Sequence, residues 1–386
     1  MLSLLNPLVA STAATNASAA VQETLPGNAT LRVLEGVAPE GLPGWLLPLV
    51  TAHISVGIVI AMISVIAMAC VWLERKVSGH IQCRYGPMYA GGWHGWAQTI
   101  ADGVKLLQKE DMIPSGADKP LFVLAPALVL GSIFGAFVAM PLSPDFFFAD
   151  INLGVFFILG MASLTTIGVV MSGWASNSKW SLYGAMREAA QVVAYEIPLG
   201  LALMVALISA GTFNLREASA AQSGWFGMEW FIFQNPFVFP AAILFFIATL
   251  AETKRAPLDL PEAESELVAG FLTEYSGIRW SFFFMEEYAA MYLMSLVASV
   301  FFFGGFESPF TYLAVEQFGA DSFIANLVGA VTLIVKSMLG IILMMWVRWT
   351  LPRVRIDQVM TMGYKYLTPL CLVCVLGAAT YKAIVS

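Results

Sequence analysis

Long apolar runs, each about the length of a helix that crosses a bilayer, recur along the whole chain. The hydrocarbon core of a membrane requires about 20 consecutive apolar residues per helix. Of the 386 residues, 59% are hydrophobic and only 12% are charged, which is far from the balance of a soluble protein. We predict an all-α polytopic membrane protein with amphipathic interfacial helices and about eight transmembrane helices, at 48–73, 121–141, 152–174, 187–210, 237–253, 281–304, 324–347 and 366–385.

Lysine and arginine are concentrated in alternate loops. They follow the first, third, fifth and seventh runs, whereas loops 142–151 and 305–323 contain none and loop 211–236 contains only Arg216. By the positive-inside rule, the odd-numbered spans end at the cytoplasmic face. We expect a multi-pass protein of the bacterial inner (cytoplasmic) membrane with both termini periplasmic; the mitochondrial inner membrane is the alternative.

Residues 1–45 differ from the rest of the chain. Their apolar run, Met1–Ala10, is too short to span a bilayer, and no positively charged segment precedes it, so we do not expect a cleaved signal peptide. We predict a loosely structured N-terminal extension over 1–45 and a single transmembrane domain over 46–386, with an acidic cytoplasmic-side loop over 252–280.

Eight carboxylates lie between two apolar runs, within Ala251–Tyr288. They are Glu252, Asp259, Glu262, Glu264, Glu266, Glu274, Glu286 and Glu287. A carboxylate in hydrocarbon either finds a partner or keeps its proton, and ionisable residues at membrane depth usually mark a pathway for charge. The stretch therefore predicts a proton pathway.

Spacing within the stretch predicts particular pairs. Glu262 and Glu266 lie four residues apart, so a helix would place them on one face and raise the pKa of at least one of them. Arg255 can form a two-pronged pair with a carboxylate such as Asp259.

The fourth predicted span contains an acid more than two turns from its start. Pro198 removes a backbone donor beside this residue, Glu196. A neutral, hydrogen-bonded core carboxyl is one interpretation and a proton relay is the other, which we favour because such acids are costly. Glu188, Gln191 and Tyr195 share one helix face.

Two further ionisable groups are expected inside the membrane. Glu287 lies in the first turns of the sixth span, and its neighbour Glu286 points about 100° away and is expected to be the exposed one. Lys336 lies near the middle of the seventh span, where it requires an acid or a water-filled cavity.

The loop after the first span adds a short helix and two charges. The apolar residues of Trp93–Lys109 recur every three or four positions, which predicts an interfacial amphipathic helix. Asp102 lies beside that apolar stripe and is either a relay group or a solvated acid. Glu74 and Arg75 are adjacent and suggest an ion pair.

Redox cofactors have no evident binding motif on this chain. The four cysteines do not cluster, and Cys371 and Cys374 form a single pair without a second one. The three histidines do not form a ligand cluster, so we predict no metal site and no prosthetic group.

Several separated stretches together resemble one family. This family is the membrane subunit of respiratory complex I that meets the peripheral arm, which is numbered 1 in mitochondria and lettered H in bacteria. The resemblance covers about 48–386 and is carried by Glu74–Lys76, Ile81–Pro87, Ala101–Glu110, Ser176–Lys179, Tyr195–Pro198, Ala251–Phe271, Glu287-Tyr288 and Pro352–Gln358. The chain departs from the family pattern at Met88-Tyr89, usually Asn-Arg, and at Lys254, usually Asn.

The resemblance implies a subunit of a proton-pumping NADH:quinone oxidoreductase, not catalytic alone, that forms the membrane part of a quinone tunnel. Quinone would be the substrate, and flavin and iron–sulfur clusters would be held by partner subunits. The partners would be peripheral-arm quinone-site subunits, small membrane subunits and the lipid bilayer, with no nucleic acid. The implied proton relay is Asp102, Glu196, Glu252, Asp259, Glu262, Glu264, Glu266 and Glu287, to which depth in the membrane adds Lys336. The implied tunnel residues are Glu74, Arg75, Arg84, Arg187 and Arg255.

Other functions stay open at this point. The homologous subunit of a membrane-bound hydrogenase-type complex would carry similar motifs. A stand-alone cation/proton antiporter also suits buried acids and Lys336, although we find no internal repeat of the kind typical of transporters. A purely structural anchor does not account for so many intramembrane acids.

Overall fold

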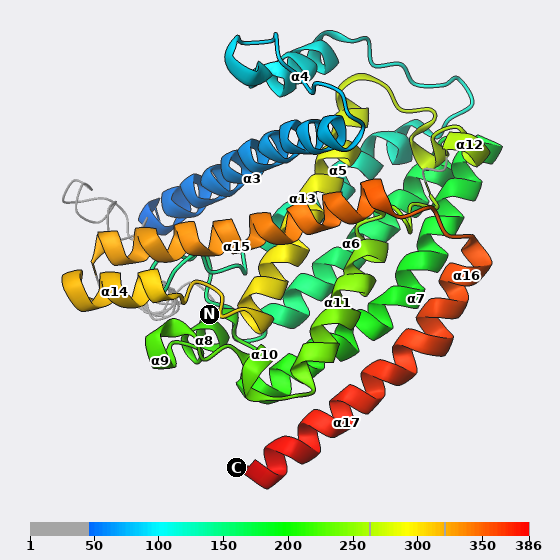
Figure 1. The fold of residues 1–386 in the computed structure, drawn as a ribbon. Coiled ribbons are helices and arrows are strands. Elements are labelled where there is room, and N and C mark those ends of the chain that lie inside the picture. The colour runs from blue at the N-terminus through cyan, green and yellow to red at the C-terminus, as the bar shows by residue number, and fades with distance from the viewer. Residues whose placement is uncertain (1–45, 262–263, 320–321, 386) are drawn as a thin grey trace, which may run out of the picture.

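The computed structural model describes residues 46–261, 264–319 and 322–385, which fold into a bundle of long helices (Figure 1). The predicted N-terminal extension, 1–45, lies outside these residues. The long helices are α3 (Leu46–Ile81), α5 (Lys119–Phe137), α6 (Gly154–Ala175), α7 (Lys179–Ala210), α11 (Val238–Glu252), α13 (Gly277–Phe302), α15 (Phe323–Thr350) and α17 (Thr368–Val385). Each of them overlaps one of the predicted spans.

The lengths and compositions of these helices agree with an all-α polytopic membrane protein. Six helical segments of the described chain are long and apolar enough to cross a membrane: Leu49–Ile81, Lys119–Phe137, Gly154–Ala175, Lys179–Ala210, Phe323–Thr350 and Ile356–Val385. α11 is apolar but has only 15 residues, and α13 has 26 residues that include adjacent glutamates. The predicted fold class is therefore confirmed.

Short helices connect the long ones. They are η1 (Trp93–Gly95), α4 (Gln98–Gln108), α8 (Leu215–Ala220), α9 (Gly224–Gly227), α10 (Phe231–Gln234), α12 (Glu264–Leu267), η2 (Gly270–Leu272), α14 (Pro309–Phe318), α16 (Ile356–Thr361) and the π-turn η3 (Met362–Leu367). The predicted amphipathic helix is split, because His94 adopts a positive φ and α4 begins only at Gln98. The apolar side chains of this region, such as Trp93 and Leu107, are exposed.

Helix α13 runs through the middle of the bundle. It packs against α3, α5, α11 and α15, and α3 and α15 lie side by side in front of it in Figure 1. From Glu286 to Val297 every residue of α13 is buried. A helix that is apolar on all sides belongs in the core of a bundle. Any ionisable group on this part of α13 is therefore enclosed whichever way it points.

Close backbone contact fixes the loop after α12 against α7. A Cβ atom on Gly184 of α7 would lie only 2.6 Å from the Cα atom of Gly270 in η2. The two segments can approach so closely only because both residues lack a side chain. This contact holds the chain between α11 and α13 over the start of α7, where the charged residues described next are found.

Candidate functional site

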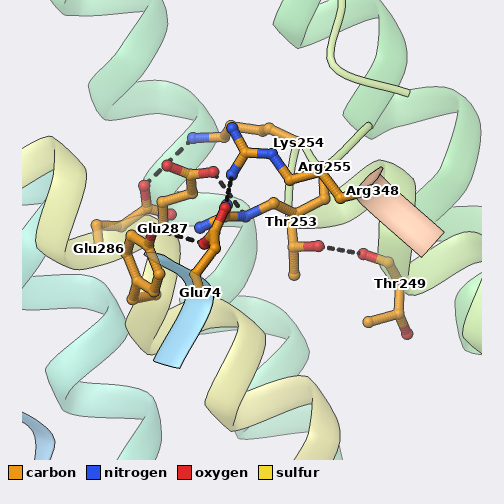
Figure 2. A network of polar contacts seen from close by, with 9 residues as sticks. Glu74, Thr249, Thr253, Lys254, Arg255, Glu286, Glu287 and Arg348 are labelled. Atoms are coloured by element: carbon orange, nitrogen blue, oxygen red, sulfur yellow. Dashed lines mark hydrogen bonds and ion pairs between the residues drawn. The ribbon is translucent and has the colours of Figure 1, made fainter. Parts of the chain in front are cut away.

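The turn after α11 directs two basic side chains into the bundle. α11 ends at Glu252, and the backbone N–H of Arg255 donates to the carbonyl of Leu250 at 3.0 Å, while that of Lys254 donates to Ala251 at 3.3 Å. These bonds form a Schellman cap, whose left-handed position is usually glycine. Here Lys254 takes that position, with a φ of 55°. The side chains of Lys254 and Arg255 then join two different groups of acids (Figure 2).

The first group, which we call the Arg255 cluster, consists of Arg255, Glu74, Glu287, Tyr288 and Arg348. Arg255 is only 2% exposed, and its Nη1 and Nε atoms lie 3.0 Å from Glu74 and 2.8 Å from Glu287. The hydroxyl of Tyr288 donates to Glu74 at 2.6 Å, and Arg348 donates to the other oxygen of Glu74 at 2.5 Å. The cluster thus balances two cations with two carboxylates.

Arg255 stays protonated inside this cluster. Burial opposes its charge, but the negative charge of Glu287, the Tyr288 hydroxyl and the negative charge of Glu74 outweigh burial, so its pKa lies well above the usual value. The guanidinium is therefore a fixed positive charge. Only the acids around it can take up or release a proton.

The second group, which we call the Lys254 triad, consists of Lys254, Glu188 and Glu286. The Nζ atom of Lys254 lies 2.7 Å from Glu188 Oε1 and 3.3 Å from Glu286 Oε2. All three residues are at most 5% exposed. Unlike the Arg255 cluster, this triad contains two carboxylates for one cation.

A pair of acids continues the network toward the interior of α7. Ser163 donates a hydrogen bond of 2.8 Å to Glu196, and Glu196 interacts through its charge with Glu252 at the end of α11. Glu252 also interacts through its charge with Lys254 and both acids of the triad. The charged groups therefore form a series from Glu74 to Glu196, joined by ion pairs within the Arg255 cluster and the Lys254 triad and by charge interactions between these groups, Glu252 and Glu196.

Several oxygens in this region lack a hydrogen-bond donor among the described residues. They include Oε2 of Glu188, Oε2 of Glu252 and Oε1 of Gln191, all of them buried. Buried oxygens normally accept at least one hydrogen bond. These atoms are therefore suited to holding a proton or a bridging water molecule. The amide of Gln191 does have partners, since it donates to the carbonyls of Ala251 and Leu258.

The network lies at one end of the bundle. Glu74 is near the C-terminal end of α3, Arg348 is in the last turn of α15, and Glu188 and Glu286 are in the first third or half of α7 and α13. The loops that carry most of the basic residues leave the bundle at the same helix ends. The acids are therefore enclosed but lie close to the face that the positive-inside rule assigns to the cytoplasm.

Three of the predicted residues lie outside the network, near α4. Arg75 forms an ion pair of 2.6 Å with Asp102 on α4, and Gln98 also donates to Asp102 at 3.2 Å. The side chain of Asp102 is 26% exposed. Arg84 donates to Gln82 at 2.6 Å in the exposed loop before η1. The structure thus groups Arg75 with Asp102 and leaves Arg84 apart.

A second outlying pair joins α7 to α12. Arg187 lies 2.5 Å from Glu266, whose side chain is 54% exposed. The hydrogen bond from Arg187 lowers the pKa of Glu266, so Glu266 is not the member of the Glu262–Glu266 pair with a raised pKa. Glu262 itself and the side chain of Glu264 lie outside the described residues.

Asp259 is half-buried beside the Arg255 cluster. Its charge acts on Glu287, and its backbone carbonyl accepts a hydrogen bond from Arg353. The expected two-pronged pair between Arg255 and Asp259 is not among the ion pairs of the described chain, because Arg255 is engaged by Glu74 and Glu287 instead.

Lys336 lies more than three helical turns from Arg348 along α15. Its Nζ atom donates to the carbonyls of Phe303 at 2.7 Å, Gly305 at 3.0 Å and Glu307 at 2.6 Å. These carbonyls follow the C-terminal end of α13, where the helix dipole favours a cation. Lys336 also lines a largely apolar cavity of about 530 Å³ between α11, α13 and α15.

Two expectations, about the partner of Glu74 and the exposure of Glu286, are wrong. Glu74 pairs with Arg255 and Arg348 and not with its neighbour Arg75. Glu286 is not the exposed member of its pair, since it is 3% exposed and contacts Lys254. Local spacing misleads in both cases, because the central position of α13 and contacts between distant helices decide the partners.

Part of the network has no counterpart among the predicted site residues. The residues named as site residues from the sequence do not include Glu188, Lys254, Glu286 or Arg348. Glu188, Gln191 and Tyr195 do lie on one side of α7, as their spacing predicts, and all three are buried. That face, together with the basic dipeptide Lys254-Arg255, is the signal in the sequence that could have found the missing residues.

Comparisons with known proteins agree with the resemblance. A family model described as NADH dehydrogenase matches residues 54–379. The H subunit of NADH-quinone oxidoreductase from Chlorobium luteolum is 43% identical over 348 residues, which cover 90% of this chain and 91% of that protein. The H subunits from Chlorobaculum parvum and Anaeromyxobacter dehalogenans are 45% and 42% identical, over 78% and 85% of this chain and 84% and 81% of theirs.

The family model covers well over half of the chain, and the relatives extend over most of its length. The chain therefore belongs to the NADH dehydrogenase family of multi-pass membrane proteins, the family of the H subunit of NADH-quinone oxidoreductase.

Proposed function

We propose that this chain forms the membrane part of a quinone-binding tunnel and couples quinone reduction to proton translocation. The observation that carries the proposal is the series of interacting charges from Glu74 to Glu252, which are buried, and on to Glu196, which is half-buried. Enclosing such charges is costly, and ionisable residues at membrane depth usually mark a pathway for charge. The relatives are named as H subunits of NADH-quinone oxidoreductase, which supplies the reaction to which the pathway would be coupled.

The Arg255 cluster is the end of the series that would respond to the quinone. Reduction of a quinone to a quinol consumes two electrons and two protons, and it therefore changes the charge of its surroundings. Glu74 and Glu287 share the fixed charge of Arg255, so a proton gained or lost by one acid changes how strongly Arg255 attracts the other. This change of charge in the Arg255 cluster would reach the Lys254 triad through Lys254, which is adjacent to Arg255 in the turn after α11.

The outlying pairs belong to the proposed tunnel rim. Arg75 with Asp102, and Arg187 with Glu266, lie on segments that leave the bundle at the same end as the network. Arg84 lies in the loop between α3 and η1. We assign them to the region where peripheral-arm subunits, carrying flavin and iron–sulfur clusters, would complete the quinone site.

The basic loops support the orientation in which this end faces the cytoplasm and both termini face the periplasm of a bacterial inner membrane. In that arrangement the quinone would approach from the bilayer, and protons would leave the network through the interior of the bundle toward small membrane subunits.

The experiment compares Glu196→Gln with Glu316→Gln, an exposed glutamate of α14 that serves as the matched control. Inverted membrane vesicles are assayed for NADH oxidation with decylubiquinone and with ferricyanide, which accepts electrons without the membrane part. We expect Glu196→Gln to lower the quinone-dependent rate at least tenfold at an unchanged ferricyanide rate, and the control to affect neither.

A normal quinone-dependent rate in Glu196→Gln would contradict the proposed relay. The partners that copurify with the tagged chain separate the remaining alternatives. Flavin and iron–sulfur subunits that oxidise NADH support the proposal, a hydrogenase module favours the related complex, and a chain that isolates alone and exchanges cations favours an antiporter.

A further inference from the structure

The Lys254 triad carries one more negative charge than it can balance internally. With both carboxylates ionised and the ammonium protonated, the charges of Glu188, Lys254 and Glu286 sum to −1. The three side chains are 1%, 5% and 4% exposed, so this charge is enclosed. An unbalanced charge in such surroundings is costly. The triad by itself is neutral only when one of its two carboxyl groups holds a proton.

The triad lies between the two other parts of the network. On one side Lys254 is bonded to Arg255, and its charge also acts on Glu287 of the Arg255 cluster. On the other side its charge acts on Glu252, which in turn interacts with Glu196. Among the described residues, the charged groups that interact with the ammonium are Glu188 of α7, Glu252 of α11, and Glu286 and Glu287 of α13.

The two acids of the triad are held differently. The Nζ atom of Lys254 lies 2.7 Å from Glu188 Oε1, whereas its hydrogen bond to Glu286 Oε2 is longer, at 3.3 Å. The ring of Phe271 covers the ammonium at 5.4 Å. A flexible lysine side chain fixed between two acids can therefore favour either one through a small movement.

We propose that Lys254 is a positioning residue of the relay, which moves its charge between Glu188 and Glu286 as a single proton passes through the triad; this inference rests on the proposed function. When a proton released by the Arg255 cluster forms an O–H bond at Glu286, the ammonium shifts toward Glu188. When that O–H bond breaks and a new one forms at Glu252, the ammonium shifts back toward Glu286. Lys254 keeps all three of its hydrogens throughout.

The test uses the assembled complex with Lys254→Met, which removes the cation, and Lys254→Arg, which keeps it. The decylubiquinone rate is divided by the ferricyanide rate, so that loss of assembly is not read as loss of coupling, and is measured across the pH range. We expect Lys254→Met to lose at least tenfold in this ratio and Lys254→Arg to keep at least half of it. The pH optimum of Lys254→Met should move toward alkaline pH, because two facing carboxylates lose the charge that favours their ionised forms.

A Lys254→Met complex with the normal ratio and the normal pH profile would overturn the inference. If that variant does not assemble, Glu188→Gln and Glu286→Gln decide the question, because each leaves one carboxylate for one ammonium and removes the transferable proton. An unchanged ratio and pH profile in both would equally overturn it. Glu196→Gln separates the two proposals: if it is impaired while the triad variants are normal, only the triad inference fails, and if it too is normal, the relay itself fails.

Discussion

Two cations of this bundle, the buried Arg255 and the half-buried Lys336, are stabilised in different ways. Arg255 is surrounded by the carboxylates of Glu74 and Glu287, whereas Lys336 donates to three backbone carbonyls at the end of α13. Carbonyls have no proton to exchange, while carboxylates do. Depth in the membrane therefore does not identify a proton pathway by itself; the chemistry of the partner does.

The largest expected effect is that of Arg255→Met. This variant leaves two carboxylates buried beside Arg348 alone, and removing one partner of a buried pair costs about 3–5 kcal/mol. We expect little assembled complex in the membrane, measured by native electrophoresis, and partial recovery in Arg255→Lys, which keeps the charge. Assembly of Arg255→Met at the normal level would mean that the cluster does not hold the bundle together.

A smaller effect is expected for Lys336→Met. It leaves the three carbonyls that follow α13 without their cationic donor, which costs about 1–2 kcal/mol. We expect a lower thermal midpoint of the solubilised complex, with the quinone-dependent rate per assembled complex unchanged. A loss of rate as large as that of Glu196→Gln would instead place Lys336 in the relay, as its position in the sequence suggests.

The smallest effect concerns the acid near Lys336. Burial raises the pKa of Glu307 to about 7, against the opposing charge of Lys336. Between about pH 4.5 and 7 the folded chain then binds more protons at this site than the unfolded chain, so its contribution to stability falls as pH rises. We expect Glu307→Gln to raise the thermal midpoint at pH 8 by a few degrees and to leave it unchanged near pH 4. An equal gain at both values would show that burial of the charge is not the cause.

The fold class and the approximate location of the long helices could be predicted because apolar runs of helical length have few other interpretations. The intramembrane acids Glu196 and Glu287 were recognisable for the same reason, since each interrupts such a run. Helix boundaries were less predictable: α7 begins at Lys179, eight residues before the predicted start, because its first turns are too polar for a hydropathy argument yet pack on η2.

The partners of the charged residues could not be predicted. Arg255 binds Glu74, which lies 181 residues away, although Asp259 is only four residues away. Spacing ranks neighbours in the sequence, and it carries no information about which distant helices meet. Glu286 shows the same limit, because an amphipathic interpretation assumes that a helix has an exposed side, and the middle of α13 has none.

Lys254 and Arg255 share one peptide unit at the end of α11, and that unit includes a residue in a conformation costly for a side chain. A single unwinding of this cap would withdraw both positive charges from their acids at the same moment. The Arg255 cluster and the Lys254 triad would then break and re-form together, with the end of α11 as the hinge.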